Sequence, residues 1–360
     1  MTGRHDVVVV GGGQAGLAIG YFLAQGGLDF TILEAADVPA AAWRERWDSL
    51  RLFTPARYSS LPGLAFPGDP ERYPGRDEVA DYLSRYAAHF ELPVERGRRV
   101  RSLRREHEGF VLAVGDRSYE ADQVVVATGP FQTPRFPPFA ERLGDEVTQL
   151  HSSSYRSPAS IPSGRVVVVG GGNSGFQIAE DLSGSHEVHL AVGSRQMPLP
   201  QRILGRDLFW YLDRAGLMSV TKDSLLGRRM AGRDTLIGSS PRRLRRRTTV
   251  TLHGRAVDAD GTALMFADGS TVDAETVIWA TGFRPDLSWV EVPVVDDEGR
   301  LVHTRGVTRE PGLYFLGLTW QHTRGSALLG WVKDDAGYLA QQISAFHAAR
   351  RTEPPQRHLA

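Results

Sequence analysis

The apolar residues of this chain gather into short uninterrupted runs, which segments of mixed polarity separate. Residues 7–10 and 166–169 are each four consecutive valines, and residues 122–127 (DQVVVA) and 276–280 (TVIWA) are nearly as apolar. Such runs are typical of parallel strands that are covered on both faces, because every side chain of such a strand is buried. The pattern therefore predicts an α/β fold built on buried parallel strands.

Helical spacing follows both valine runs. Leu17, Tyr21 and Ala24 recur at helical intervals after the first run, and residues 178–182 continue a helix after the second. The pattern also predicts strands at residues 30–33, 188–192 and 313–316, a small antiparallel appendage with short strands around residues 94, 100 and 110–114, a hairpin around residues 265–272, and helices over residues 78–90, 208–217 and 334–348.

A glycine motif of the form G-x-G-x-x-G follows each valine run. The first glycine permits a tight turn, the second lets the backbone approach a pyrophosphate, and the third lets the next helix lie close to the sheet, with its N-terminus directed at the phosphates. The motif residues are Gly11, Gly13, Gln14, Ala15 and Gly16 in the first turn, and Gly170, Gly172, Asn173, Ser174 and Gly175 in the second. The chain is thus expected to have two dinucleotide sites.

The residues that end the two partner strands differ. Glu34 ends the first and is placed to accept hydrogen bonds from ribose hydroxyls, which favours FAD or NAD over NADP. The second ends in Gly193, Ser194 and Arg195, without an acid. A guanidinium beside a hydroxyl matches a 2'-phosphate, so this site is expected to prefer NADPH, with NADH a further option. The alternative is that Arg195 is only a surface arginine.

Small residues stand at the carboxyl ends of three predicted strands, where they would let a cofactor approach the backbone. They are Thr128 and Gly129 after the strand at 122–127, Thr281 and Gly282 after the strand at 276–280, and Gly317 after the last strand. We expect two Rossmann-like dinucleotide-binding domains, the second inserted into the first. The predicted FAD-binding domain comprises residues 1–160 and 275–360, and the NAD(P)H-binding domain comprises residues 161–274.

The composition excludes several classes of function. Acidic and basic residues balance at 42 each among 360 residues, so no overall charge attracts nucleic acid or an anionic membrane. The basic run RRLRRR at 242–247 favours a solvated face over a phosphate site. No apolar stretch is long enough to cross a bilayer, and the first strand begins too early for a signal peptide, so a cytoplasmic protein is expected.

The chain contains no cysteine. This excludes a redox-active Cys-x-x-Cys pair, thiolate zinc sites and iron–sulfur clusters. We find no Ser/His/Asp set, no paired catalytic carboxylates and no metal site in the sequence. Electron transfer would therefore depend on bound cofactors.

Residues 41–63 are expected to form a long ordered loop across the first cofactor. Trp43 and Arg44 could flank an isoalloxazine ring and its phosphate linkage. The alternative for both Trp43 and Trp47 is that they are hydrophobic plugs, and it has more weight for Trp47. In the predicted helix over 208–217, the aromatic residues are expected to be core rather than a substrate wall.

Taken together in order, these motifs resemble those of the flavin-containing monooxygenases. The closest resemblance is to the short bacterial branch that includes flavoproteins encoded beside metal- and arsenic-resistance genes. It covers nearly the whole chain: GGGQAG with Glu34, AAWRERWDSLRLFTP, HSSSY from His151, GGGNSG, ATGFRPD and LYFLGL. The chain departs from the family pattern at Asp145 and Val147, and Phe53-Thr54-Pro55 stands where many relatives have an asparagine.

The resemblance implies that the first glycine set and Glu34 hold FAD, with Trp43 and Arg44 beside it. It implies that the second set and Arg195 hold NADPH, and that the two Ala-Thr-Gly segments are interdomain hinges. NADPH would reduce the flavin, and oxygen would form a C4a-hydroperoxide that oxygenates a small sulfide or amine, with a ketone as a further option.

His151 and His322 are candidate proton donors or structural residues, and the loop at 41–63 and residues 320–331 are candidate lids. The expected partners are O2 and a small molecule, without nucleic acid or membrane, and a homodimer is an option. The alternative functions are an NAD(P)H-dependent flavin reductase or NADPH oxidase, and a non-catalytic FAD/NADP(H) redox sensor.

Overall fold

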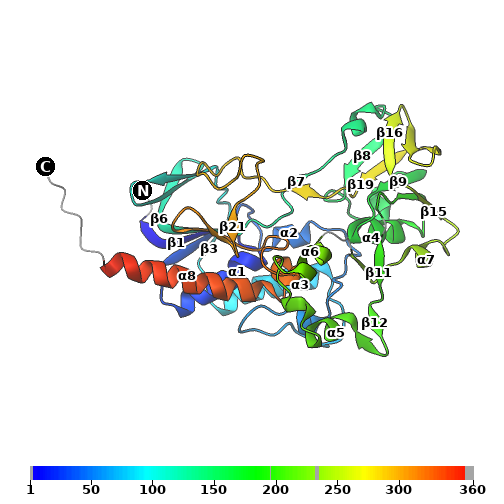
Figure 1. Cartoon of the computed structure of the whole chain (residues 1–360). Coiled ribbons are helices and arrows are strands. Elements are labelled where there is room, and N and C mark those ends of the chain that lie inside the picture. Colours follow the sequence, from blue (N-terminus) through cyan, green and yellow to red (C-terminus); the bar gives the residue numbers. More distant parts are fainter. Residues whose placement is uncertain (1–2, 195, 232–234, 353–360) are drawn as a thin grey trace.

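The computed structural model describes residues 3–194, 196–231 and 235–352. These residues form two lobes, each built around a sheet with parallel strands at its centre (Figure 1). The first lobe contains both the opening strands and the long closing helix, and the second is made from the middle of the chain. The structure is therefore an α/β fold with parallel sheets, as the valine runs predict.

The sheet of the first lobe is parallel at its centre, where β1 pairs with both β2 and β6. The pairs β21–β22, β22–β23, β4–β5 and β5–β6 are antiparallel. Its strands in spatial order are β21 (His303–Thr304), β22 (Val307–Thr308), β23 (Leu313–Phe315), β6 (Arg117–Val126), β1 (Arg4–Val10), β2 (Phe30–Leu33) and β3 (Val94–Glu95), with β4 (Ser102–Glu106) and β5 (Gly109–Val114) joined to β6.

The first valine run is buried because the two faces of this sheet carry different layers. Val7 and Val9 pack with helices α1 (Gln14–Gln25), α3 (Arg76–His89) and α8 (Val332–Thr352). Val8 and Val10 pack instead with β4, β5 and residues 290–294. Alternate side chains thus lie in two separate cores. Each valine is therefore removed from water, which stabilises the fold. Figure 1 shows α8 running along the lobe beside α1.

The sheet of the second lobe is entirely parallel, and α4 (Asn173–Leu182) packs on one face. A small antiparallel sheet and the 3-10 helix Pro138–Arg142 cover the other face. The parallel strands in order are β15 (Val250–His253), β10 (Glu187–Ala191), β9 (Arg165–Val169), β19 (Thr276–Trp279) and β8 (Thr148–His151). The small sheet consists of β16 (Ala256–Asp260), β17 (Ala263–Phe266) and β18 (Thr271–Asp273).

A two-stranded ladder lies where the chain passes between the lobes. The strand β7 (Thr133–Pro134) pairs antiparallel with β20 (Phe283–Arg284) (Figure 1). The strands β8 and β19 lie outside the predicted 161–274 segment, yet both pair in the second sheet. We therefore propose that an inserted NAD(P)H-binding domain begins and ends at this ladder rather than at residues 161 and 274.

The segment between β10 and β15 forms small elements that reach back to the first lobe. The buried Asp207 accepts a hydrogen bond from the Tyr73 hydroxyl at 2.5 Å and caps α5 (Leu208–Arg214) through the Phe209 amide at 2.7 Å. The other elements of this segment are β11 (Met197–Leu199), β12 (Arg202–Ile203), β13 (Arg206–Asp207), the 3-10 helix Leu217–Ser219, α6 (Leu225–Ala231), β14 (Thr235–Ile237) and α7 (Pro241–Leu244).

Most predicted elements are present, and the differences have local causes. The strand at Val94 belongs to the main sheet, where it pairs with β2, so it is not part of the antiparallel appendage, and Val100 lies outside any strand. The helix predicted over 208–217 ends at Arg214, because Gly216 takes a left-handed conformation with φ of 65°. None of the described helices is both long and apolar enough to span a bilayer.

The remaining short elements lie in the connecting segments. They are α2 (Ala41–Arg44) and the 3-10 helices Ala56–Tyr58, Pro158–Ser160 and Arg324–Ala327. The first two belong to the stretch 41–63, which is otherwise a loop, as predicted.

Candidate functional site

The first glycine turn is constrained by the protein at two of its three motif positions. Gly11 has φ of 111°, and a Cβ there would lie 2.6 Å from the Ala127 carbonyl oxygen. A Cβ at Gly16 would lie 1.9 Å from the Gly11 carbonyl oxygen. A Cβ at Gly13 would meet no atom within 4 Å. The middle glycine therefore faces open space at the N-terminus of α1, which is where this motif places a pyrophosphate.

Glu34 lies beside this turn and is held by two backbone amides. Its carboxylate accepts hydrogen bonds from Gly12 N at 2.7 Å and from Ala36 N at 2.9 Å. Each carboxylate oxygen can accept a further hydrogen bond, so ribose hydroxyls can still be bound. The strand β2 delivers this side chain, because its pairing with β1 places both carboxyl ends at one edge of the sheet.

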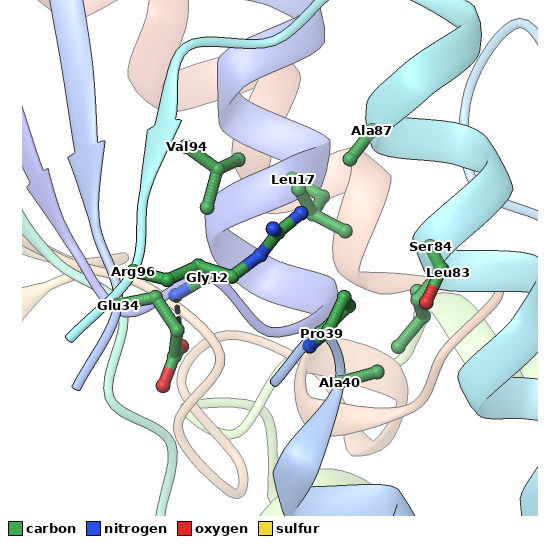
Figure 2. A pocket seen from close by; sticks show the side chains of 10 residues that line it. All are labelled: Gly12, Leu17, Glu34, Pro39, Ala40, Leu83, Ser84, Ala87, Val94 and Arg96. Atoms are coloured by element: carbon green, nitrogen blue, oxygen red, sulfur yellow. Dashed lines mark hydrogen bonds between the residues drawn. The ribbon is translucent and has the colours of Figure 1, made fainter. Parts of the chain in front are cut away.

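A pocket next to the turn has the character that an adenosine group requires. Figure 2 shows Glu34 at its floor, joined to Gly12, and the Arg96 side chain extending across it toward Leu17. The lining residues are Gly12, Leu17, Glu34, Pro39, Ala40, Leu83, Ser84, Ala87, Val94 and Arg96. Apolar side chains offer walls to a purine, and one carboxylate offers acceptors to a ribose. The residues of this site thus fit the adenosine and diphosphate portions of FAD.

The second glycine turn repeats this geometry closely. Gly170 has φ of 135°, and a Cβ there would lie 2.2 Å from the Ala280 carbonyl oxygen. A Cβ at Gly175 would lie 1.9 Å from the Gly170 carbonyl oxygen, and a Cβ at Gly172 would meet nothing within 4 Å. Open space again faces the middle glycine, at the N-terminus of α4. This turn therefore also fits a diphosphate.

The surroundings of the second turn differ in charge. Where Glu34 stands beside the first turn, Gln196 stands here, and its Nε2 would lie 2.8 Å from a Cβ on Gly171. Nε2 donates to the Ser194 hydroxyl at 3.2 Å, whereas Oε1 is buried with no hydrogen-bond partner among the described residues. Buried polar atoms are normally satisfied, and a ribose hydroxyl or an adenine amine would supply the donor. This orphaned acceptor fits a visiting nucleotide.

A guanidinium that the sequence reasoning missed lies at the same edge. Arg255 donates to the Gly193 carbonyl oxygen from Nη2 at 3.0 Å and from Nε at 3.3 Å. The parallel pairing of β10 and β15 brings these two loops together, although 62 positions separate them. The predicted Arg195 lies outside the described residues, and the described Ser194 is exposed.

The side chain of Asn173 forms its hydrogen bonds with the protein backbone in this structure. Its Nδ2 donates to the Thr235 carbonyl oxygen at 3.2 Å, and its Oδ1 accepts from Ile237 N at 3.0 Å. The side chain therefore fastens β14 to the start of α4. Asn173 and Ser174 begin this helix, so their backbone amides are the groups that face the open space.

Each Ala-Thr-Gly segment is hydrogen-bonded to the last residue of the strand that precedes a glycine turn. Ala127 N donates to the Val10 carbonyl oxygen and Ala280 N to the Val169 carbonyl oxygen, each at 2.8 Å. The glycines of these segments have positive φ angles, which suit a site where a cofactor approaches the backbone closely. Gly129 has φ of 74°, Gly282 has φ of 82°, Thr128 is exposed and Thr281 bonds to the Arg135 carbonyl oxygen. Gly317, with φ of 85°, packs against Ala15 in the first turn.

The two tryptophans of the 41–63 loop have different surroundings. Trp43 packs against the core of the first lobe, near the start of α3. Trp47, only 4 % exposed, packs with Tyr155 and Phe176 in the core of the second lobe. Trp47 is therefore the hydrophobic plug of the two alternatives. Arg44 forms an ion pair with Asp81 at 2.7 Å.

His151 and the neighbouring Arg46 lie at the ladder between the lobes. His151 is 3 % exposed, its Nε2 donates to the Gly282 carbonyl oxygen at 3.0 Å, and burial lowers its pKa. Its Nδ1 accepts a hydrogen bond from Ser153. The Arg46 guanidinium lies 5.8 Å from the Phe131 ring and 5.7 Å from the Phe283 ring. One cation thus contacts both linkers. Both ring nitrogens of His151 are thus engaged by protein groups in this structure.

His322 lies in the segment predicted as a lid. Its ring has no hydrogen bond to any described residue, and burial together with the Arg305 charge lowers its pKa. The buried Asp335 raises that pKa and pairs with Arg305 at 2.8 Å. A neutral imidazole with a free nitrogen can still donate or accept a proton.

Aromatic residues from three separate segments meet between the lobes. Tyr58 stacks on Trp331 with ring centroids 5.7 Å apart, Phe209 lies 5.6 Å from Trp331, and Phe53 stacks on Phe209 at 6.0 Å. These four residues, which we call the aromatic cluster, come from the 41–63 loop, α5 and the segment before α8. Phe209 is fully buried, as predicted for a core residue.

The arginines of residues 242–247 are exposed, and two of them pair with Glu180 at 2.9 and 3.2 Å. This matches a solvated face. Within the described part of the chain, no group of three or more His, Cys, Asp or Glu residues could hold a metal ion.

Comparisons with known proteins agree with this geometry. The family model described as pyridine nucleotide-disulphide oxidoreductase matches residues 8–200. The CzcO-like oxidoreductase of Geobacillus kaustophilus is 46% identical, over 94% of this chain and 98% of the relative. The probable indole-3-pyruvate monooxygenase YUCCA1 of Arabidopsis thaliana is 27% identical, over 90% of this chain and 87% of that protein.

Among solved structures, this fold is similar to that of the flavin-containing monooxygenase from Stenotrophomonas maltophilia. The TM-score is 0.81 with 32% sequence identity, and the match covers 96% of this chain and 99% of that one. The disulphide chemistry in the name of the family model has no counterpart here, because the sequence has no cysteine.

Proposed function

This chain belongs to the flavin-containing monooxygenase family, a group of FAD- and NADPH-dependent oxidoreductases, and we propose that it oxygenates a small soft nucleophile with O2. The substrate class is a sulfide or an amine, with a ketone as a further option. For a sulfide the balance is sulfide, O2, NADPH and a proton giving sulfoxide, NADP+ and water. One oxygen atom enters the product, and the two electrons of NADPH reduce the other to water.

The pair of glycine turns carries this proposal. Both turns leave open space at their middle glycine, but a carboxylate stands beside the first turn and an uncharged amide beside the second. A carboxylate suits the unphosphorylated ribose of FAD and repels a 2'-phosphate. One chain can thus hold a flavin in one lobe and receive NADPH in the other. Bound FAD supplies the redox chemistry by accepting hydride and activating oxygen.

The protein binds and orients these cofactors with the residues described above. Glu34 would accept hydrogen bonds from the FAD ribose, and the amides that begin α1 would bind its phosphates. The amides that begin α4 would bind the NADPH diphosphate. Arg255, if released from the Gly193 carbonyl oxygen, would add a charge-assisted contact to the 2'-phosphate together with Ser194 and Arg195.

Exclusion of water is the second task, because water diverts activated oxygen to peroxide. The aromatic cluster closes the space between the two lobes with Phe53, Tyr58, Phe209 and Trp331. The buried Asp207 holds α5 in place through Tyr73. His322 is the candidate that can move a proton near this site, since its ring makes no hydrogen bond within the described chain.

Isotope incorporation tests the proposal. The FAD-loaded protein is given NADPH, 18O2 and methyl phenyl sulfide, and the sulfoxide is analysed by mass spectrometry. The expected result is one 18O atom per sulfoxide and one sulfoxide per NADPH consumed. NADPH consumption that yields only hydrogen peroxide would identify an NADPH oxidase, and FAD-loaded protein that does not consume NADPH would identify a sensor.

A further inference from the structure

Arg324 is a partly buried cation without a partner. It begins the 3-10 helix Arg324–Ala327, and its side chain forms no ion pair, hydrogen bond or ring contact with any described residue. Burial lowers its pKa, and no charged neighbour contributes to that shift. Two other partly buried arginines have an anion beside them: Arg305 pairs with Asp335 at 2.8 Å, and Arg76 pairs with Asp48 at 2.8 Å. Arg324 therefore differs from them in having no anion beside it.

Such an arrangement is unfavourable for folding, because a guanidinium that gives up part of its water gains no ion pair in exchange. Residues that are kept in unfavourable electrostatic surroundings gather at functional sites. Arginine is also the side chain whose planar fork matches a carboxylate through two parallel hydrogen bonds. An anion that arrives with a ligand would remove the cost.

The position of this 3-10 helix places it within the proposed site. The Ala327 carbonyl oxygen accepts a hydrogen bond from Gln14 Nε2, in the first glycine turn, at 2.8 Å. Thr323 forms a β-bridge with Thr221, from the segment between β10 and β15. Trp331, of the aromatic cluster, lies beside Gly325. The helix thus joins the FAD turn, the other lobe's segment and the aromatic cluster.

We propose that Arg324 binds the carboxylate of the substrate, so that the preferred substrates are acidic sulfides or amines. This inference rests on the proposed function and narrows its substrate class. The glycine turns already offer backbone amides to the cofactor phosphates, whereas the partly buried Arg324 precedes Gly325, which lies beside Trp331 of the aromatic cluster. An acidic substrate would place its apolar portion against the partly exposed rings of the cluster and its carboxylate on Arg324.

The test compares an acid with its neutral ester in the FAD-loaded protein. 4-(Methylthio)benzoate and its methyl ester are titrated without NADPH, and the flavin absorbance reports binding. We expect the acid to bind at least about tenfold more tightly than the ester, and Arg324→Gln to weaken acid binding about tenfold while leaving ester binding within about twofold. Arg324→Lys should be intermediate, because it keeps the charge and loses the fork. The exposed Arg309, changed to Gln, is the control for loss of one positive charge.

Equal acid affinity in the wild type and Arg324→Gln would overturn the inference. So would an unchanged acid-to-ester ratio accompanied by loss of FAD or a shifted flavin reduction potential, since Arg324 would then serve the cofactor. The melting temperature should not fall in Arg324→Gln, and a marked fall with unchanged selectivity would indicate a structural residue. Sulfoxide production from the ester tests the proposed function separately, because the binding difference is measured without turnover.

Discussion

The two glycine turns share a backbone but differ in what lies beside them. In each, the third glycine would bring a Cβ to 1.9 Å from the carbonyl oxygen of the first, and the middle glycine faces open space. Gly12 donates to Glu34, however, whereas Gly171 lies under the amide of Gln196. We propose that the shared backbone binds a diphosphate in each lobe and that the different neighbours select different riboses. We infer that the choice between FAD and NADPH depends on the residues at one edge of each sheet and not on the glycine turn itself.

Replacing the third glycine of either turn should have the largest effect on cofactor binding and stability. In Gly16→Ala the new methyl group meets the Gly11 carbonyl oxygen, so we expect loss of FAD and a destabilisation of about 1–3 kcal/mol or more. Gly175→Ala has the same clash but should retain its yellow colour and lose reduction by NADPH. Flavin absorbance, thermal unfolding and anaerobic reduction measure these effects. A Gly16→Ala protein with full FAD content would break the assignment of the first turn.

A side chain at the middle glycine of either turn should block cofactor binding without preventing folding. Gly13→Val and Gly172→Val each place a Cβ where the structure has no other atom within 4 Å, so we expect both proteins to fold. We expect Gly13→Val to be colourless, and Gly172→Val to be yellow with a KM for NADPH raised about a hundredfold. Circular dichroism confirms the fold, and steady-state kinetics give KM. Retained FAD in Gly13→Val would show that this space does not hold the diphosphate.

Charge at the second edge should set the preference for NADPH over NADH. Arg255→Ala is expected to raise the KM for NADPH about tenfold, which corresponds to about 1.4 kcal/mol, with little change for NADH. Arg195→Ala should act in the same direction. Adenosine 2',5'-bisphosphate binding, measured by calorimetry, reports the same contact without turnover. Arg142→Ala, which breaks an exposed ion pair with Asp258 at 2.7 Å, is the matched control.

A parallel loss of NADPH and NADH affinity in Arg255→Ala would contradict its proposed role at the 2'-phosphate. That outcome would indicate that Arg255 only supports the Gly193 loop, whose carbonyl oxygen it contacts in this structure.

The last expected effect is that of pH on stability, and it should arise mainly in the first lobe. Burial is the main reason that the pKa of His303 is lowered to about 4; Lys222 also acts to lower this pKa, while Asp335 and Asp223 act to raise it. In the unfolded chain this histidine has an ordinary pKa of about 6.5. Between about pH 6.5 and pH 4 it is therefore protonated more in the unfolded chain than in the folded chain. Stability is complete above about pH 6.5 and falls as the pH drops toward 4.

Thermal unfolding of the wild type and His303→Asn at pH 7 and pH 5 checks this expectation. The variant should lose less stability between the two values. His253, in the second lobe, also has a pKa lowered by burial and by His189, so His253→Asn serves as the comparison. Equal pH dependence in the wild type and His303→Asn would assign the effect elsewhere.

Local sequence was enough to predict the buried valine-rich strands, the glycine turns and the position of Glu34. These features depend on neighbouring residues: four valines need two covering layers, and glycines are required where φ is positive or a Cβ would meet backbone. Their signals therefore lie within a few positions of one another. The cofactor at the first turn could be inferred for the same reason, because Glu34 follows that turn by one helix and one strand.

The tertiary structure alone decided which distant side chains meet. Trp47 reaches the core of the other lobe, Arg255 lies on the loop of Gly193, and Arg46 contacts both linkers. Arg324 has no anion beside it among the residues that the structure describes. No periodicity or motif marks these residues, because each depends on how segments tens to hundreds of positions apart are brought together. Local sequence specifies backbone conformation within an element. Partners and electrostatic compensation follow only from the path of the whole chain.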